Sequence, residues 1–131
     1  MIVVDCSYAL ALVLPDEVRP ASMRSVLAMP LAAPTIWSLE VANVLRNSLR
    51  RGRLDDAGAD EICQRLADLQ VDVIASGHAL PRRHLDAALA HDLTPYDASY
   101  IVLAQQVSGP LATRDASLSR AARKAGITVY E

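Results

Sequence analysis

The sequence contains no phenylalanine, and aromatic residues occupy only 4% of its 131 positions. Aliphatic side chains must therefore fill the interior. The hydrophobic content of 52% is sufficient for a packed globule and too high for a disordered chain. Alanine occurs 22 times, which favours helices. The length is that of one domain, and we expect residues 1–131 to form it.

The sequence also lacks the patterns that indicate disulfide pairs, membrane spans and secretory leaders. Cys6 and Cys63 lie far apart in the sequence with no Cys-x-x-Cys motif, which is typical of reduced thiols. No run of 18 apolar residues occurs, and residues 1–5 lack the basic segment of a secretory signal. We therefore expect a cytoplasmic protein that makes no membrane contact.

Positive charge is not in excess, because 13 Lys and Arg residues face 15 Asp and Glu residues, a net charge of −2. This balance excludes binding of nucleic acid through bulk positive charge. Lys124 is the single lysine, and the other basic residues are arginines, whose planar guanidinium suits phosphate and carboxylate. A GC-rich genome would produce the same bias, so the arginines alone identify no ligand.

Short apolar runs alternate along the chain with segments of helical character. We expect helices at 8–14, 20–29, 35–51, 55–69, 79–91, 96–106 and 116–125, and strands at 2–5, 31–33, 71–74, 111–113 and 127–129. Ser7 is the expected N-cap of the first helix, and Gly52 and Gly126 are expected helix ends. Buried strands separated by helices predict an α/β fold with a parallel sheet of four to five strands and about seven helices.

Four acidic residues lie where this fold would gather them. Asp5 lies at the carboxyl end of the first expected strand, and Asp115 follows the 111–113 strand by two residues. Asp97 and Glu40 lie near the starts of expected helices. Sites in open parallel sheets form beyond the carboxyl ends of the strands. Each acid also has a structural alternative, since Asp5, Asp97 and Asp115 could be helix caps and Glu40 a solvated helix residue. Asp5 is the hardest to explain in that way, because a charge that closes a buried strand needs a partner.

The residues around Glu40 predict that its side chain points into a cleft. Its turn is apolar on most sides, and steps of three and four residues from it give a polar stripe, Glu40, Asn43, Asn47 and Arg50. We therefore expect the turn to be largely buried, with Trp37, Leu39, Val41 and Val44 packed around the acid.

Four carboxylates in one cleft repel one another, by about 1 kcal/mol per pair near 4 Å in water and about 4 kcal/mol at an effective dielectric of 20. Such a cluster predicts proton sharing or a bound cation. An all-oxygen ligand set selects Mg²⁺ or Mn²⁺. The chemistry indicated is metal-assisted attack of water on a phosphodiester.

Four segments carry a family resemblance: Ile-Val-Val-Asp5-Cys-Ser7, Trp37-Ser-Leu-Glu40-Val-Ala-Asn43, Tyr96-Asp97-Ala-Ser-Tyr100 and Leu-Ala-Thr113-Arg-Asp115. In this order the sequence resembles the PIN-domain ribonucleases and, more narrowly, the VapC-type toxins of bacterial toxin–antitoxin pairs, over the whole chain. The resemblance implies a PIN-like three-layer α/β/α fold. It also implies a homodimeric, metal-dependent endoribonuclease that cuts RNA, with tRNA or rRNA loops as substrates, and that a small antitoxin inhibits.

The resemblance also implies residue roles. Asp5, Glu40, Asp97 and Asp115 would be the catalytic and metal-binding quartet, with Asp5 and Asp97 contacting Mg²⁺ or Mn²⁺ directly. Ser7 and Thr113 match the small hydroxyl positions that support such a site. Cys6 departs from the more usual Thr or Ala, but it is also small and often buried.

Several other residues keep two interpretations. One interpretation is that RNA or an antitoxin contacts Asn43, Arg46, Arg50 and Arg114. The other is that the arginines of this helix are solvated residues near its end. The same two interpretations apply to Arg120, Arg123 and Lys124. Trp37 and Tyr100 are expected in the core or at a dimer contact, and the alternative for both is a platform on which RNA bases stack. The histidines at 78, 84 and 91 lack the spacing of a metal site.

Three other function classes can be weighed against the nuclease. A receiver domain needs a lysine after a late strand, and a haloacid-dehalogenase-type phosphatase needs Asp-x-Asp near the start, where residue 7 is Ser. Neither pattern is present. A catalytically inactive PIN-like module that binds RNA or protein remains the alternative.

Overall fold

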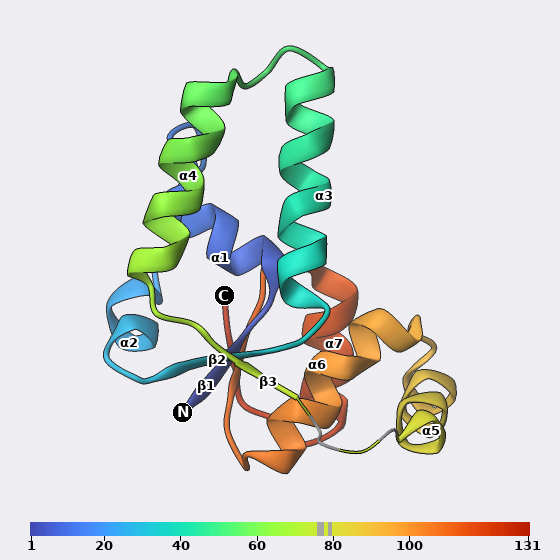
Figure 1. The fold of residues 1–131 in the computed structure, drawn as a ribbon. Coiled ribbons are helices and arrows are strands. Elements are labelled where there is room, and N and C mark those ends of the chain that lie inside the picture. The colour runs from blue at the N-terminus through green and yellow to red at the C-terminus, as the bar shows by residue number, and fades with distance from the viewer. Residues whose placement is uncertain (76–77, 79) are drawn as a thin grey trace.

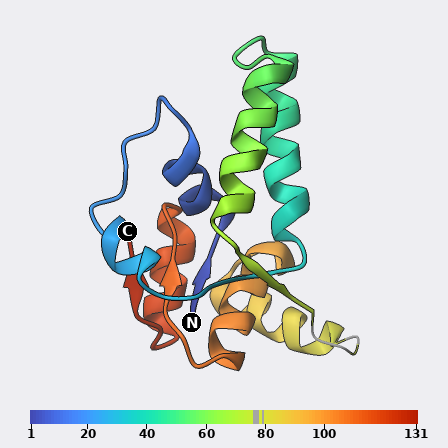
Figure 2. The same ribbon diagram turned by 60° about the vertical axis from the view of Figure 1, so that its left-hand side comes forward.

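The computed structural model describes residues 1–75, 78 and 80–131, which contain seven helices and five strands. The chain forms a three-layer α/β structure around one parallel sheet, seen from two sides in Figure 1 and Figure 2. Along the sequence the elements are β1 (Ile2–Val4), α1 (Cys6–Val13), α2 (Met23–Leu27), β2 (Leu31–Pro34), α3 (Trp37–Arg50), α4 (Asp56–Asp68), β3 (Asp72–Ile74), α5 (Pro81–His91), α6 (Pro95–Gln106), β4 (Leu111–Ala112), α7 (Ala116–Lys124) and β5 (Val129–Tyr130).

β1 is the central strand, and its side chains alternate between two apolar clusters. Val3 packs with residues of α1, α3, α6 and α7 on one face, while Ile2 and Val4 pack with Tyr8 and Val26 on the other. All three strand residues are fully buried. A strand buried on both faces reads as a continuous apolar run, which is why this segment shows no polar alternation.

The strand order in the sheet is β3-β2-β1-β4-β5. The direction in which the chain adds strands therefore reverses between β1 and β4. The chain first builds β2 and β3 on one side of β1 and then returns to add β4 and β5 on the other. Ligand sites of open α/β sheets form at such a reversal, beyond the carboxyl ends of the strands. The residues that leave β1 and β4 at this edge are Asp5 and the segment 113–115.

α3 and α4 form a helical hairpin that projects beyond the sheet (Figure 1). Gly52 follows α3 with a φ of +70°, a left-handed conformation that glycine adopts without strain. Asp55 then caps α4 by accepting a hydrogen bond of 2.7 Å from the backbone N–H of Gly58. The expected helix end and helix start are therefore present at the tip of the hairpin.

All of the expected helices and strands occur, but several boundaries differ. The N-cap of α1 is Asp5 rather than Ser7. Thr94 caps α6, which begins at Pro95. β2 extends by one residue to Pro34, and β3 is an exposed edge strand rather than a buried one. The expected start of α5 at position 79 lies outside the described residues, and the helix begins at Pro81.

Two further elements have bounds that differ from those expected. The last strand begins at Val129 instead of 127, because the N–H of Ile127 bonds to the carbonyl of Ala122 and so completes the end of α7 at Gly126. α2 is shorter than expected and spans Met23–Leu27. The Ser22 hydroxyl just before it contacts the Tyr8 hydroxyl at 2.8 Å and donates to the carbonyl of Glu131 at 2.6 Å. No helix among the described residues is both long and apolar enough to cross a membrane.

The turn before β4 generates a stability prediction. A Cβ at Gly109 would lie 2.5 Å from the backbone oxygen of Met1, so that β4 would have to shift against β1. We expect Gly109→Ala to lower the free energy of unfolding by about 1–3 kcal/mol, measured by urea denaturation.

Gly58→Ala is the matched control for this substitution. Its added Cβ would meet mainly the end of the flexible Leu54 side chain, at 2.7 Å, in a helix that favours alanine. If Gly109→Ala were no more destabilising than this control, the close approach of the two backbones would not limit the fold.

Candidate active site

Four carboxylates from four different segments line one cavity of about 200 Å³ at the carboxyl edge of the sheet. Asp5 follows β1, Glu40 lies on α3, Asp97 lies in the first turn of α6, and Asp115 follows β4. Cys6, Ser7, Leu10, Val44 and Tyr100 complete the lining. The four acids singled out in the sequence lie up to 110 positions apart and nevertheless line one cavity.

Asp5 is almost fully buried, with 5% of its surface exposed, and it accepts hydrogen bonds from three donors. The Thr113 hydroxyl donates to Oδ2 at 2.6 Å, the Ser7 hydroxyl donates to Oδ1 at 2.8 Å, and the Tyr8 N–H donates to Oδ1 at 2.8 Å. Burial raises the pKa of Asp5, these donors oppose the rise, and the charge of Asp115 adds to it. Asp5 is thus a helix cap and a site carboxylate at the same time.

Ser7 and Thr113 do more than stabilise the Asp5 charge. The Ser7 hydroxyl accepts the N–H of Arg114 at 2.9 Å, and the Thr113 hydroxyl accepts the N–H of Asp115 at 3.0 Å. Both hydroxyls therefore connect the Asp5 carboxylate to the backbone that leads from β4 to Asp115. Their positions suit the supporting role expected of them.

Glu40 is held by a residue whose role the sequence did not reveal. Tyr100 is 1% exposed, and its hydroxyl donates to Glu40 Oε1 at 2.5 Å. Burial raises the pKa of Glu40, the Tyr100 bond opposes this, and the charges of Asp97 and Asp5 raise it further. Tyr100 was expected in the core or at a dimer contact, with base stacking as the alternative, and not as a partner of Glu40. Its spacing of three residues from Asp97 on one helix face was the available signal.

The surroundings of Glu40 differ from expectation. Leu39 is 66% exposed, so the turn is not largely buried. The stripe that begins at Glu40 continues into the cavity through Val44, and Asn43 is exposed and does not line it. The first turns of α3 contact the core mainly through Trp37 and Val41, which leaves the opposite side of the helix in solvent.

Asp97 and Asp115 were both possible helix caps, and the structure shows that only Asp115 is one. Thr94 caps α6 by accepting the N–H of Asp97 at 3.2 Å, so the Asp97 carboxylate is not the cap. Burial and the charge of Asp115 raise the pKa of Asp97. Asp115 caps α7, because its Oδ1 accepts the N–H of Leu118 at 2.8 Å, and it lines the cavity as well.

The donor set fits a hard divalent cation. Burial and the charges of Glu40 and Asp5 raise the pKa of Cys6 to about 12, which keeps the thiol neutral and leaves oxygen ligands only. Among the residues that the structure describes, no three His, Cys, Asp or Glu side chains converge closely enough to form a ready-made ion site. The fit of a divalent cation to this site therefore rests on the oxygen ligands and on the cavity that the four acids share.

The remaining candidates lie outside this cavity. Arg46 and Arg50 are exposed on α3, and Arg114 is an exposed residue whose guanidinium donates to the Val18 carbonyl at 3.4 Å. Trp37 is buried in the core, as expected. The structure does not bring these three arginines to the acids, so any contact they make with a ligand lies at the margin of the site.

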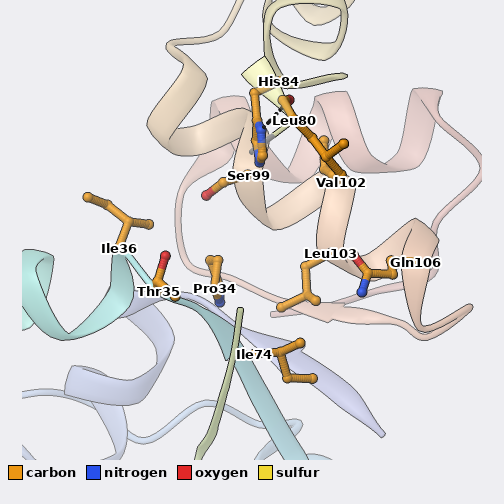
Figure 3. Close-up of a pocket in the computed structure, with 10 residues that line it drawn as sticks. All are labelled: Pro34, Thr35, Ile36, Ile74, Leu80, His84, Ser99, Val102, Leu103 and Gln106. Atoms are coloured by element: carbon orange, nitrogen blue, oxygen red, sulfur yellow. Dashed lines mark hydrogen bonds between the residues drawn. The ribbon is translucent and has the colours of Figure 1, made fainter. Parts of the chain in front are cut away.

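The histidines of α5 lie outside the acidic cavity. His84 lies within 3.1 Å of the Leu80 carbonyl through Nδ1 and lines a separate cavity of about 90 Å³, drawn in Figure 3. There it faces Ser99 of α6, with Pro34 and Ile74 at the ends of two strands below. His91 lines a groove beside α7.

Comparisons with known proteins agree with this architecture. The model of the PIN domain family matches residues 2–124. Ribonuclease VapC3 of Pyrobaculum aerophilum is 33% identical over 120 residues, which cover 90% of this chain and 92% of the relative. Ribonuclease VapC9 of Mycobacterium tuberculosis is 33% identical over 122 residues, 91% of this chain and 89% of the relative.

Two solved structures share the fold. PAE2754 from Pyrobaculum aerophilum superposes with a TM-score of 0.74 at 25% identity, covering 98% of this chain and 87% of that chain. FitAcB from Neisseria gonorrhoeae superposes with a TM-score of 0.56 at 18% identity, covering 100% of this chain and 97% of that chain, which supports the fold alone. The sequence match over nearly the whole chain and the shared fold lead to one conclusion: this chain belongs to the PIN domain family, and within it to the VapC type.

Proposed function

We propose that this protein is a metal-dependent endoribonuclease that hydrolyses RNA and acts as the toxin of a toxin–antitoxin pair. The observation that carries this proposal is the single cavity that Asp5, Glu40, Asp97 and Asp115 line together. Relatives at 33% identity that match nearly their full length are named ribonucleases, which supports the same activity. We propose Mg²⁺ or Mn²⁺ as the ion, a cognate antitoxin as inhibitor, tRNA or rRNA loops as substrates, and a homodimer as the assembly.

Each residue has a defined part in this proposal. Asp5 and Asp97 would hold the ion directly, while Glu40 and Asp115 would act partly through water bound to the ion. The ion would activate the attacking water and neutralise charge on the scissile phosphate. Thr113 and Ser7 hold the Asp5 carboxylate in place, and their hydrogen bonds oppose the rise in its pKa that burial causes. Tyr100 fixes Glu40 through Oε1 and leaves Oε2 as the oxygen available to the site.

A PIN-like module that binds RNA without cutting it is the alternative function. A module of this kind does not need four acids at one cavity, where burial and the charges of the other acids raise the pKa of Asp5, Glu40 and Asp97 and oppose folding. Retention of such a cluster is explained by a bound cation. The nuclease therefore accounts for more of the structure.

Cleavage of RNA tests the proposal directly. We expect purified protein to cut RNA with Mg²⁺ or Mn²⁺ and to lose activity in EDTA, measured by gel electrophoresis of an end-labelled tRNA or rRNA fragment pool. Asp97→Asn, which keeps shape and removes charge, should lower the rate by at least about 100-fold. Full activity in EDTA would contradict the metal requirement, and wild-type rates for Asp97→Asn would contradict the site.

The hydrogen bond between Tyr100 and Glu40 generates a second prediction. We expect Tyr100→Phe to lower kcat by about 10-fold and to raise the Mg²⁺ concentration needed for half-maximal activity, because Glu40 loses its fixed orientation. Tyr96→Phe on the same helix is the control, since Tyr96 is 63% exposed and does not line the cavity. Equal effects of the two substitutions would rule out a positioning role for Tyr100.

The raised pKa values of the site carboxyls predict how stability depends on pH in EDTA. The folded state binds these protons more tightly than the unfolded state does, so the carboxyls favour folding when protonated. Their contribution to stability is lost as the pH rises from the ordinary carboxyl range of about 4 toward 7. We expect Asp97→Asn to raise Tm by a few degrees at about pH 7 and by less at about pH 5.

Thermal unfolding of the two proteins across this pH range measures the effect. Asp92→Asn serves as the control, because Asp92 is exposed outside the cavity. A difference in Tm between Asp97→Asn and wild type that did not grow with pH would show that the Asp97 carboxylate is not under electrostatic strain.

A further inference from the structure

A groove of about 340 Å³ lies between the end of α5 and one side of α7. Residues 89–93 form one wall, and Ser117, Arg120, Ala121 and Lys124 form the other. We call this the α7 groove. Both walls lead to the acidic cavity: α7 begins directly after Asp115, and residues 89–93 run into the cap and first turn of α6, where Asp97 lies.

The α7 wall presents two positive charges on one helix face. Arg120 and Lys124 are four residues apart, which places them about 6 Å apart along the helix axis. Neither forms an ion pair within the described residues, whereas the neighbouring Arg123 pairs with Glu131 at 3.4 Å. The Arg120 Nη2 donates to the Ser117 hydroxyl at 3.3 Å, so the guanidinium is directed toward the end of α7 that Asp115 caps.

These observations address a difficulty in the proposed function. The chain carries a net charge of −2, and the acids of the cavity repel phosphate, so RNA cannot be held by the protein as a whole. Positive charge must be supplied locally, next to the cavity. Arginine and lysine that have no carboxylate partner are suited to phosphate, because no ion pair has to break before they bind it.

We propose that the α7 groove binds the RNA backbone on one side of the scissile phosphate, with Arg120 and Lys124 contacting successive phosphates. This inference rests on the proposed function, since it supplies the substrate path of the same site. The exposed carboxylate of Asp92, which also lines the groove, opposes this binding and provides a variant of opposite sign.

Binding of an end-labelled oligouridylate to the cleavage-deficient Asp97→Asn protein tests the groove by fluorescence anisotropy at several salt concentrations. The double variant Arg120→Gln/Lys124→Gln should bind at least about 10-fold more weakly. The slope of log K against log salt should fall in magnitude by about 1.4, because two phosphate contacts to a single strand are lost. The double variant Arg24→Gln/Arg83→Gln, which removes two exposed arginines elsewhere, should leave both the affinity and the slope unchanged.

Asp92→Asn should change the affinity in the opposite direction. Asp92 has a φ of +51°, a conformation that Asn adopts as readily, so the substitution removes charge without straining the backbone. We expect tighter RNA binding by a few-fold, and Tm measurements will confirm that each variant is folded.

The outcomes separate this inference from the proposed function. If the wild type cleaves RNA while Arg120→Gln/Lys124→Gln in the Asp97→Asn background keeps its affinity and salt slope, the α7 groove is wrong and the nuclease stands. If that double variant loses binding of oligoglutamate but not of oligouridylate, the groove binds an acidic protein segment, which also overturns the inference. If the wild type cleaves nothing although RNA binding depends on Arg120 and Lys124, the groove is supported and the nuclease fails.

Discussion

The buried carboxylate of Asp5 is the interaction on which the site and the centre of the fold both depend. A charge at the end of the central strand must be matched by donors, because an unpaired buried carboxylate is costly. The Thr113 hydroxyl, the Ser7 hydroxyl and the Tyr8 N–H supply them. Since Thr113 follows β4 and Tyr8 belongs to α1, stabilising one charge also aligns two strands and a helix. Satisfying this carboxylate thus builds the floor of the cavity.

Around this floor, function opposes stability. Burial raises the pKa of Glu40 and of Asp97, and the charges of neighbouring carboxylates raise it further. The fold tolerates this charge because every acid also has a local structural anchor: Asp5 and Asp115 cap helices, Tyr100 binds Glu40, and Thr94 caps the helix that carries Asp97. A divalent cation would relieve the remaining repulsion. The protein therefore combines an acidic centre with arginines and a lysine kept outside it.

The sequence predicted most of the helices and strands and the four acids that line the cavity. Its predictions were wrong where tertiary packing determines the contacts and the burial of a residue. The apolar runs located the five strands, and glycines 52 and 126 ended two helices with positive φ. The cap of α1 was assigned to Ser7 instead of Asp5, because both residues are good caps and only the hydrogen bond of Tyr8 distinguishes them. The burial around Glu40 was overestimated, because apolar residues such as Leu39 can face solvent when a helix leaves the core.

What the sequence determined by itself is local: periodicity, caps and the position of each acid at the edge of an element follow from neighbouring residues. What only the tertiary structure decided is which of these groups meet. The bond between Tyr100 and Glu40 joins residues 60 positions apart. The α7 groove depends on where the end of α5 lies relative to α7, with α6 in contact with both helices. Spacing along the chain cannot specify such contacts. They arise from the strand order, which places β1 beside β4, and from the close packing of helices against that sheet.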